Sequence, residues 1–239
     1  MATMQMSVLN PETKLNELVK GDDPAKDQSY FLFPMRQEDL QHTIFPVGHF
    51  KKNQVRDLAR KLELRIAEKP DSQDICFVQS KSYSEFVESR AADLLAETKG
   101  YIVDVQGNVL AEHEGVYNYT IGQRKGLGHL NKQVPLYVVS TDPHTKTVVV
   151  GEDNDLFKSK CIVSHMNWII PPELEKAPTY GAKIRYRAAE SPAVVTPLLD
   201  NRVLVNFKTP QRAITPGQAL VLYNDDVVVG GGWIQEVVE

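Results

Sequence analysis

The spacing of apolar residues changes once along the chain, close to residue 100. Before this point apolar residues recur every three or four positions, which is typical of amphipathic helices, whereas beyond it they alternate with polar residues, as in half-buried strands. The sequence therefore predicts an α+β protein. We expect a short helical segment, a small β-rich central domain and a C-terminal antiparallel β-barrel.

Three helices are predicted before the change in spacing. They cover residues 37–44, 53–64 and 82–97. Acidic residues in the first turn of the first segment suit the helix dipole. Asn53 is the predicted N-cap of the second, and Ser82 with Glu85 three residues later forms a capping-box pattern in the third.

Short alternating segments dominate the rest of the chain. Two hairpins are predicted over residues 101–116 and 136–151, and a proline-rich segment, residues 168–178, is predicted to link two β units. Beyond it, short strands at close spacing suggest the closed barrel, and they cover residues 182–188, 193–199, 202–207, 219–223 and 227–234.

Composition and charge exclude some classes of function but do not identify one. The 239 residues carry a net charge of −4, so no global basic field indicates nucleic acid, although a local basic face is still compatible with that charge. Two distant cysteines favour a reducing compartment, and no apolar run is long enough to span a membrane. Six scattered histidines show no metal-ligand spacing. We expect a soluble, cytoplasmic protein without a membrane or metal partner.

The two cysteines differ in their surroundings. Cys76 ends the polar segment "KPDSQDIC" and is followed by apolar residues. Asp71 and Asp74 would raise the pKa of its thiol, so residue chemistry alone leaves a buried cysteine and a reactive one both open. Cys161 lies in an alternating segment, which indicates a structural role.

Three places offer polar groups to an anionic ligand. Arg124 and Lys125 stand between glycines in "YTIGQRKGLGH". Alternation in "KIRYRA" predicts a strand with three cations on one face, about 7 Å apart, which suits a phosphate backbone; these are Lys183, Arg185 and Arg187. "TPGQ" predicts a type II turn that projects Gln218. For each place a solvated charge or a bare turn is the alternative interpretation.

Several long motifs occur together and in a fixed order: "DPAKDQSYFLF", "FPVGHFKKNQVRDLA", "KPDSQDICFV", "GVYNYTIGQRKGLG", "KIRYR" and "TPGQALVLYN". With them the chain closely resembles the tRNA-specific 2-thiouridylases, the MnmA/TrmU family, over roughly residues 21–239. Members of that family use ATP and a cysteine persulfide to place sulfur at position 2 of the wobble uridine of tRNA.

The resemblance assigns roles to particular residues. Cys76 matches the cysteine that carries the persulfide. The resemblance therefore favours a reactive Cys76 over a buried structural one. The residues that match tRNA contacts are Lys26, Asp27, Gln28, Arg185, Tyr186 and Gln218. The four other cations, Arg124, Lys125, Lys183 and Arg187, are candidates for contacts to the tRNA backbone. The implied partners are the anticodon arm of tRNA and a relay protein that donates sulfur.

One departure from the family is large. The family's Ser-Gly-Gly-x-Asp-Ser loop, which holds ATP with Mg, has no counterpart in these 239 residues. The resemblance implies the C-terminal two-thirds of the enzyme, and we expect no cofactor to be bound by this chain. The expected domains are a helical tail of the catalytic domain (21–97), a central domain (98–157) and the barrel (158–239), with residues 1–20 unassigned. A stand-alone tRNA-binding module and a thiol relay protein are alternative functions.

Overall fold

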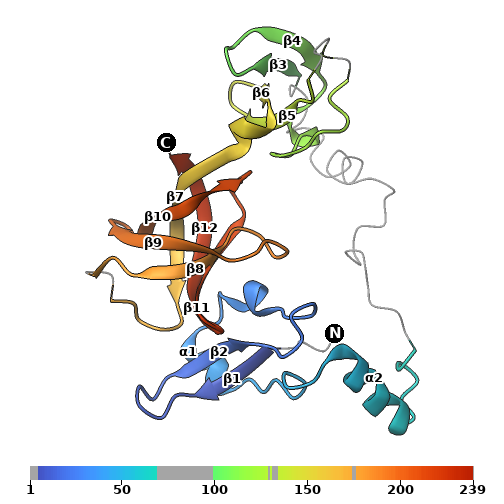
Figure 1. Cartoon of the computed structure of the whole chain (residues 1–239), viewed down its shortest axis with the longest axis vertical. Coiled ribbons are helices and arrows are strands. Elements are labelled where there is room, and N and C mark those ends of the chain that lie inside the picture. The colour runs from blue at the N-terminus through green and yellow to red at the C-terminus, as the bar shows by residue number, and fades with distance from the viewer. Residues whose placement is uncertain (1–4, 69–98, 129, 131–133, 174–175, 239) are drawn as a thin grey trace. The chain divides into compact units, whose positions relative to one another are not determined.

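The computed structural model describes residues 5–68, 99–128, 130, 134–173 and 176–238 (Figure 1). By its internal contacts the chain divides into two compact units. Unit 1 comprises residues 1–69, 159–210 and 215–239, and unit 2 comprises residues 70–158 and 211–214. Each unit has its own core, and each is described by itself.

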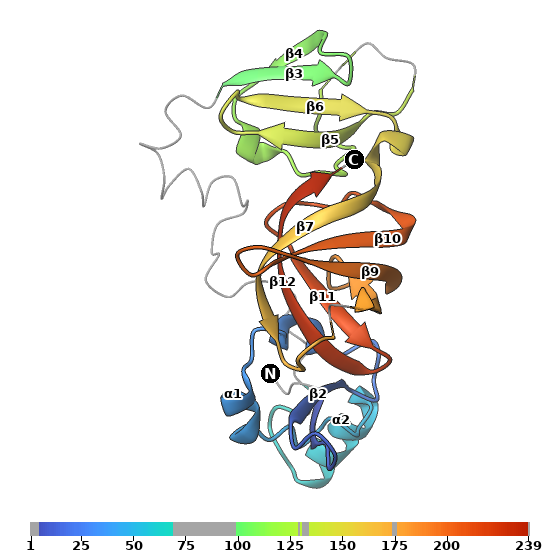
Figure 2. The same cartoon turned by 90° about the vertical axis from the view of Figure 1, so that its left-hand side faces the viewer.

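A closed antiparallel barrel forms the centre of unit 1 (Figure 2). In the described part of the chain six strands close the ring in the order β7–β12–β11–β8–β9–β10. Their bounds are β7 Phe157–Trp168, β8 Thr179–Lys183, β9 Ser191–Leu198, β10 Arg202–Arg212, β11 Ala219–Asn224 and β12 Val227–Val238. The predicted barrel is therefore present, and it buries the alternate apolar residues that predicted it, such as Val203 and Val205 of β10.

A hairpin at the start of the chain extends this sheet. β1 (Gln5–Leu9) pairs with β2 (Asn16–Lys20), and β2 pairs with β12 through Leu18 and Val19. Leu18 is fully buried there. The sequence had left residues 1–20 without a predicted element, and five-residue strands of mixed polarity give little alternation to recognise.

The segment that follows β2 packs on the barrel. It contains a short 3₁₀ helix, η1 (Ser29–Leu32), and two α-helices, α1 (Gln37–Gln41) and α2 (Lys52–Lys61). Tyr30 and Phe33 join one core cluster with Val221 and Tyr223 of β11. Because this segment shares its core with the barrel, residues far apart in sequence meet in one unit.

Unit 2 is built on a small sheet of order β4–β3–β6–β5. Its described elements are β3 (Gly100–Asp104), β4 (Val109–His113), η2 (Val116–Asn118), β5 (Tyr137–Asp142), β6 (Thr147–Gly151) and η3 (Asp153–Leu156). β3 and β6 run parallel, and the other pairs are antiparallel. Ile102, Val138 and Val148 form its core together with Leu127.

Both predicted hairpins are confirmed, and so are the first two helices. α2 begins at Lys52 with Lys51 as its N-cap, so the prediction of Asn53 as N-cap was wrong by two residues. The Gln54 side chain accepts the Lys51 backbone N–H at 2.7 Å and so caps the first turn. The helical part of the predicted α+β class is small among the described residues, which are mostly strand. The predicted third helix, residues 82–97, lies outside them.

Two further expectations were wrong. Residues 168–178 were expected to link two β units, but they connect β7 and β8 of the same barrel. The expected strand through residues 182–188 ends at Lys183, because β8 pairs with β11 only as far as that residue. The chain then turns, and the Ala188 backbone N–H donates to the Arg185 carbonyl oxygen at 3.1 Å. Lys183, Arg185 and Arg187 therefore do not share the face of one strand.

Candidate nucleic-acid interface

Asp27 stands at the centre of a buried polar network in unit 1. Its side chain is only 7% exposed and accepts hydrogen bonds from the Gly21 N–H at 3.2 Å, the Ser29 N–H at 3.1 Å and the Ser29 hydroxyl at 2.8 Å. A buried carboxylate of this kind fixes the backbone that donates to it. Lys26 and Gln28, on either side, are half-buried. The network therefore determines where these two neighbours lie.

The same network reaches the barrel. Ser29 Oγ lies 3.3 Å from the hydroxyl of Tyr223 on β11, and burial raises the pKa of that tyrosine. The next residue, Tyr30, donates its hydroxyl to the Ala219 carbonyl oxygen at 2.8 Å, and burial raises its pKa to about 12. Both phenols are therefore neutral at physiological pH and act as hydrogen-bonding groups.

Gln218 directly precedes the residue that Tyr30 contacts. It ends a turn in which its backbone N–H donates to the Thr215 carbonyl oxygen at 3.2 Å, and Gly217 has a φ of 83°. Positive φ at the third position is the mark of a type II turn, as predicted, and glycine adopts it without strain. The Gln218 side chain is exposed.

Tyr186 approaches this segment from the turn after β8. Its ring centroid lies 4.7 Å from that of Phe31 and 6.2 Å from that of Tyr30. Burial raises the pKa of Tyr186, the Asp27 carboxylate raises it further, and the Lys26 and Arg187 cations oppose this rise. Asp27, Lys26 and Arg187 therefore all act electrostatically on Tyr186.

The predicted tRNA contacts of unit 1 therefore lie around Tyr30. Arg185 lowers its pKa by proximity, against the effect of burial. The structure thus brings together residues from three distant places in the sequence, and they are Lys26, Asp27, Gln28, Arg185, Tyr186 and Gln218. Lys183 is held nearby, with its amino group 5.9 Å from the ring centroid of Tyr223.

The glycine-rich loop belongs to unit 2. Gly122, Gly126 and Gly128 all have positive φ, between 72° and 88°. Leu127 is buried in the core, which anchors the loop, and both Arg124 and Lys125 are exposed. The loop therefore presents its two cations from a backbone that only glycine adopts easily.

Comparison with known proteins is consistent across the chain. Three family models match: "tRNA methyl transferase HUP domain" over residues 4–80, "tRNA methyl transferase PRC-barrel domain" over residues 88–152, and "Aminomethyltransferase beta-barrel domain" over residues 158–234. Similar curated proteins include the tRNA-specific 2-thiouridylases MnmA of Acetivibrio thermocellus and Geotalea uraniireducens, which are 47% and 48% identical over 91% and 92% of this chain. The chain belongs to the tRNA-specific 2-thiouridylase family.

The match covers only part of those relatives. The aligned regions are 60% of the Acetivibrio protein and 58% of the Geotalea protein. A third relative, MnmA 2 of a Thermoanaerobacter species, is 46% identical over 94% of this chain and 61% of its own length. The chain thus spans about 60% of the length of the curated relatives it matches.

The structure describes only one of the two cysteines. Cys76, which the family resemblance makes the persulfide carrier, lies outside the described residues. Cys161 is on β7, is fully buried and free, and burial raises the pKa of its thiol to about 12. A thiol with this pKa is almost entirely protonated at neutral pH, so it is inert as a nucleophile. The predicted structural role of Cys161 is confirmed.

The family resemblance implies ATP, but the described residues do not fit a site for it. The glycine triplet Gly230–Gly232 lies inside β12, between β11 and β7. A Cβ at Gly231 would stand 2.8 Å from the Leu220 carbonyl oxygen and 2.8 Å from Phe33 Cδ2. These glycines therefore allow strands to approach closely and do not cradle phosphates.

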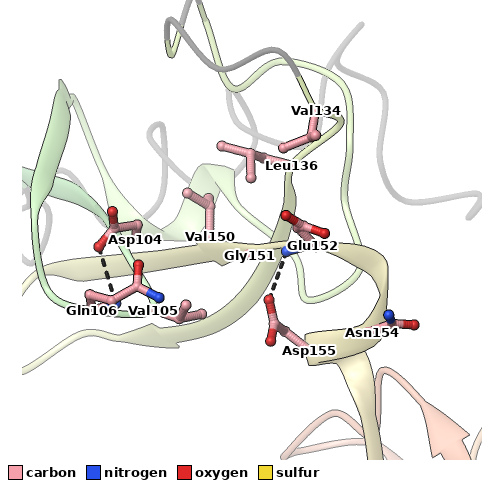
Figure 3. Close-up of a pocket in the computed structure, with 10 residues that line it drawn as sticks. All are labelled: Asp104, Val105, Gln106, Val134, Leu136, Val150, Gly151, Glu152, Asn154 and Asp155. Carbon is pink, nitrogen blue, oxygen red and sulfur yellow. Dashed lines mark hydrogen bonds between the residues drawn. The ribbon is translucent and has the colours of Figure 1, made fainter.

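Unit 2 contains a hollow of about 300 Å³ beside β6 and η3 (Figure 3). Its polar groups serve local structure: Asp104 accepts the Gln106 N–H at 3.1 Å, and Asp155 accepts the Glu152 N–H at 2.8 Å. Among the described residues no group of three or more histidine, cysteine or acidic side chains is placed to hold a metal ion. No helix of the described part is long and apolar enough to cross a membrane.

Phe31 was not singled out by the sequence, although it lies beside the gathered residues. In "SYFLF" it reads as one of several core aromatics. A 3₁₀ helix has three residues per turn, so Tyr30 and Phe33 face the same side and are buried, while Phe31 faces away. The three-residue spacing between Tyr30 and Phe33 is the sequence signal that would have identified Phe31 as the exposed aromatic residue.

Proposed function

We propose that the chain takes part in the 2-thiolation of tRNA. In this reaction ATP adenylates the oxygen at position 2 of the wobble uridine, the terminal sulfur of a cysteine persulfide displaces that oxygen as AMP, and a second thiol cleaves the remaining sulfur–sulfur bond to leave the thiolated base. Cys76 carries the persulfide, and the gathered residues of unit 1 bind tRNA. The similar proteins are tRNA-specific 2-thiouridylases, which supports the proposed reaction.

One observation carries the tRNA-binding part of the proposal. Tyr30 and Tyr186, which the sequence separates by more than 150 positions, lie with their ring centroids 6.2 Å apart, and Lys26 and Arg185 act electrostatically on this pair. A cluster of cations and aromatic rings beside a projecting glutamine suits RNA, because phosphates attract cations and bases stack on rings. The acidic net charge of the chain does not oppose this, since the field near a surface depends on local charges.

The chemistry of ATP is assigned to the family's adenylating loop, which these 239 residues do not contain. ATP with Mg is therefore a requirement of the whole reaction, and we assign it no residue in this chain. A relay protein that donates sulfur is the expected second partner, and the reducing cytoplasm is the expected location.

Binding of an unmodified tRNA transcript tests the proposal directly. Each neutralised phosphate releases counterions, so the logarithm of affinity should fall with the logarithm of salt concentration by roughly 0.7–0.9 per contact. Arg185→Ala should weaken binding and reduce this slope by about one. Gln218→Ala removes a neutral group and should weaken binding at an unchanged slope. A wild-type slope near zero, or unaltered binding in both variants, would contradict the proposal.

A tRNA-binding module without catalysis is the second candidate. It is favoured by one observation, the gathering of aromatic rings and an exposed glutamine in unit 1, which needs no nucleotide site. Incubation of the chain with tRNA, ATP and sulfide, followed by mass spectrometry of the nucleosides, tests whether this chain is catalytic by itself. We expect this chain alone to form no 2-thiouridine, and formation of the product would show that it carries the ATP chemistry itself. Tight tRNA binding that needs no Cys76 is expected for either candidate.

A further inference from the structure

Phe31 is an exposed aromatic residue held in a fixed position. Its side chain is 57% exposed, yet its ring lies 4.7 Å from Tyr186 and 5.4 Å from Tyr30, measured between centroids. The planes of Phe31 and Tyr186 are tilted by only 36°. Centroid distances of this size are those of aromatic pairs in contact. The two rings therefore form a small apolar surface open to solvent on the Phe31 side.

The backbone under this surface is tied down on both sides. Asp27 accepts the N–H and the hydroxyl of Ser29, two residues before Phe31. Two residues after it, the Phe33 carbonyl oxygen accepts the Asn167 side-chain amide at 2.7 Å, and Phe33 itself is buried. With Tyr30 bound to Ala219, Phe31 has little freedom to fold back into the core. Its exposure follows from the geometry of η1.

Three cations and the Asp27 carboxylate act electrostatically on the tyrosines beside Phe31. Lys26 and Arg187 both act on the pKa of Tyr186, and Arg185 acts on that of Tyr30. Arg187 is exposed, and Lys26 and Arg185 are half-buried. An exposed aromatic surface among cations suits a ligand that carries both a flat π system and negative charge. An unpaired nucleotide has these two properties, whereas a base within a duplex has both its faces covered.

We propose that Phe31, together with Tyr186, forms a platform on which one unpaired base of the bound RNA stacks. This inference rests on the proposed function, because it assumes that unit 1 binds tRNA, and it adds Phe31 as a residue that selects unpaired bases. The cations hold the neighbouring phosphates, and the rings hold the base. Asp27 is a positioning residue in this arrangement, since its carboxylate is buried and faces its own backbone.

Phe31→Leu tests the platform, since leucine keeps apolar bulk at an exposed position and removes the aromatic face. Loss of one stacked base corresponds to a decrease in affinity on the order of tenfold for the tRNA transcript. The salt slope should stay that of the wild type because no charge changes. Affinity for a blunt RNA duplex, which offers no unpaired base, should be unchanged. Phe31→Trp should keep the affinity for tRNA, and the emission of the new indole should be quenched on binding.

A matched control is Tyr101→Leu, which removes an aromatic side chain of similar exposure, 52%, from β3 of unit 2. It should leave tRNA affinity unchanged. Equal losses in Phe31→Leu and Tyr101→Leu, or equal losses for the transcript and the duplex, would overturn the platform. If Arg185→Ala lowers the salt slope while Phe31→Leu binds as the wild type does, the platform is wrong and the proposed function stands. If the wild type binds no tRNA, both are wrong.

Discussion

Burial gives the Cys161 thiol and the Asp27 carboxylate different roles at the residue scale. Burial favours the neutral form of the Cys161 thiol and raises its pKa to about 12. Asp27 is buried as well, but three hydrogen bonds satisfy its oxygens. The Cys161 thiol is thus unreactive, whereas the Asp27 carboxylate fixes the backbone of the segment that contains Phe31.

Alkylation with iodoacetamide at neutral pH should therefore modify Cys76 and spare Cys161. The thiolate is the reactive species, and a pKa near 12 leaves about one Cys161 in 10⁵ ionised at pH 7. Peptide mapping by mass spectrometry measures the two sites separately. In urea both should react, which controls for reagent access. Faster labelling of Cys161 in the native protein would contradict its burial and weaken the assignment of Cys76 as the sulfur carrier.

His113 provides a second prediction at this scale. It is only 4% exposed, its Nδ1 has no hydrogen-bond partner among the described residues, and burial lowers its pKa. The unfolded chain, with an ordinary histidine pKa of about 6.5, therefore binds the proton more readily than the folded one. The contribution of His113 to stability is present above that pKa and is lost as the pH falls below it.

Thermal unfolding followed by circular dichroism at pH 7.5 and pH 5.5 measures this effect. The wild type should lose stability on acidification, and His113→Gln should lose less, because glutamine does not titrate. His144→Gln, at an exposed position in the same unit, is the control and should behave as the wild type. Identical pH dependence in His113→Gln and the wild type would show that His113 is not buried in a neutral form.

At the scale of elements, β12 pairs with more strands than any other among those that the structure describes. It pairs with β11, β7 and β2, and its glycine triplet lies against Phe33 and the neighbouring backbones. Three successive residues without Cβ let the barrel close and let the segment after β2 pack on it. The glycines thus serve packing in β12, whereas Gly217 serves the conformation of a turn.

Gly231→Ala should destabilise unit 1 by about 1–3 kcal/mol, because the added methyl group would meet a backbone oxygen that cannot move without disturbing β11. Gly217→Ala is the matched comparison. It has open space for a Cβ, so its cost of about 1 kcal/mol comes from the positive φ alone. Urea unfolding followed by tryptophan fluorescence compares the two. A Gly231→Ala variant as stable as the wild type would show that β12 has room for a side chain.

At the scale of the whole molecule, the two units keep separate cores. Unit 1 gathers Leu18, Tyr30 and Val221 around the barrel, and unit 2 gathers Ile102, Val138 and Val148 around its own sheet. Stability in such a chain need not be uniform, since each core opens with its own free energy. A change in one core should then affect one unit.

Val148→Ala tests this, because it removes two methyl groups from a fully buried position in β6. Hydrogen exchange read by mass spectrometry should become faster in β3, β5 and β6 and stay unchanged in β11 and β12. Val221→Ala, on β11, should show the converse pattern. Faster exchange in β11 and β12 of Val148→Ala would mean that the two units unfold as one.

Local patterns in the sequence predicted most strands of the barrel and of unit 2. The two hairpins of unit 2, the strands β9 and β10 and the type II turn before Gln218 followed from alternation and from Pro-Gly chemistry, and β11 and β12 followed from short apolar runs, because these signals lie within a few residues. The resemblance of motifs predicted the residues assigned to tRNA, and Lys26, Asp27 and Gln28 came from that source alone.

Where those elements meet depends on contacts between segments that are distant in the sequence. The predicted strand through Arg185 and Arg187 ended at Lys183, since strand length depends on the partners available in the barrel and not on the alternation of its residues. Phe31 is exposed because a 3₁₀ turn directs its neighbours into a core that β11 completes from far along the chain. Such contacts join residues separated by nearly 200 positions, and no local pattern in a sequence records them.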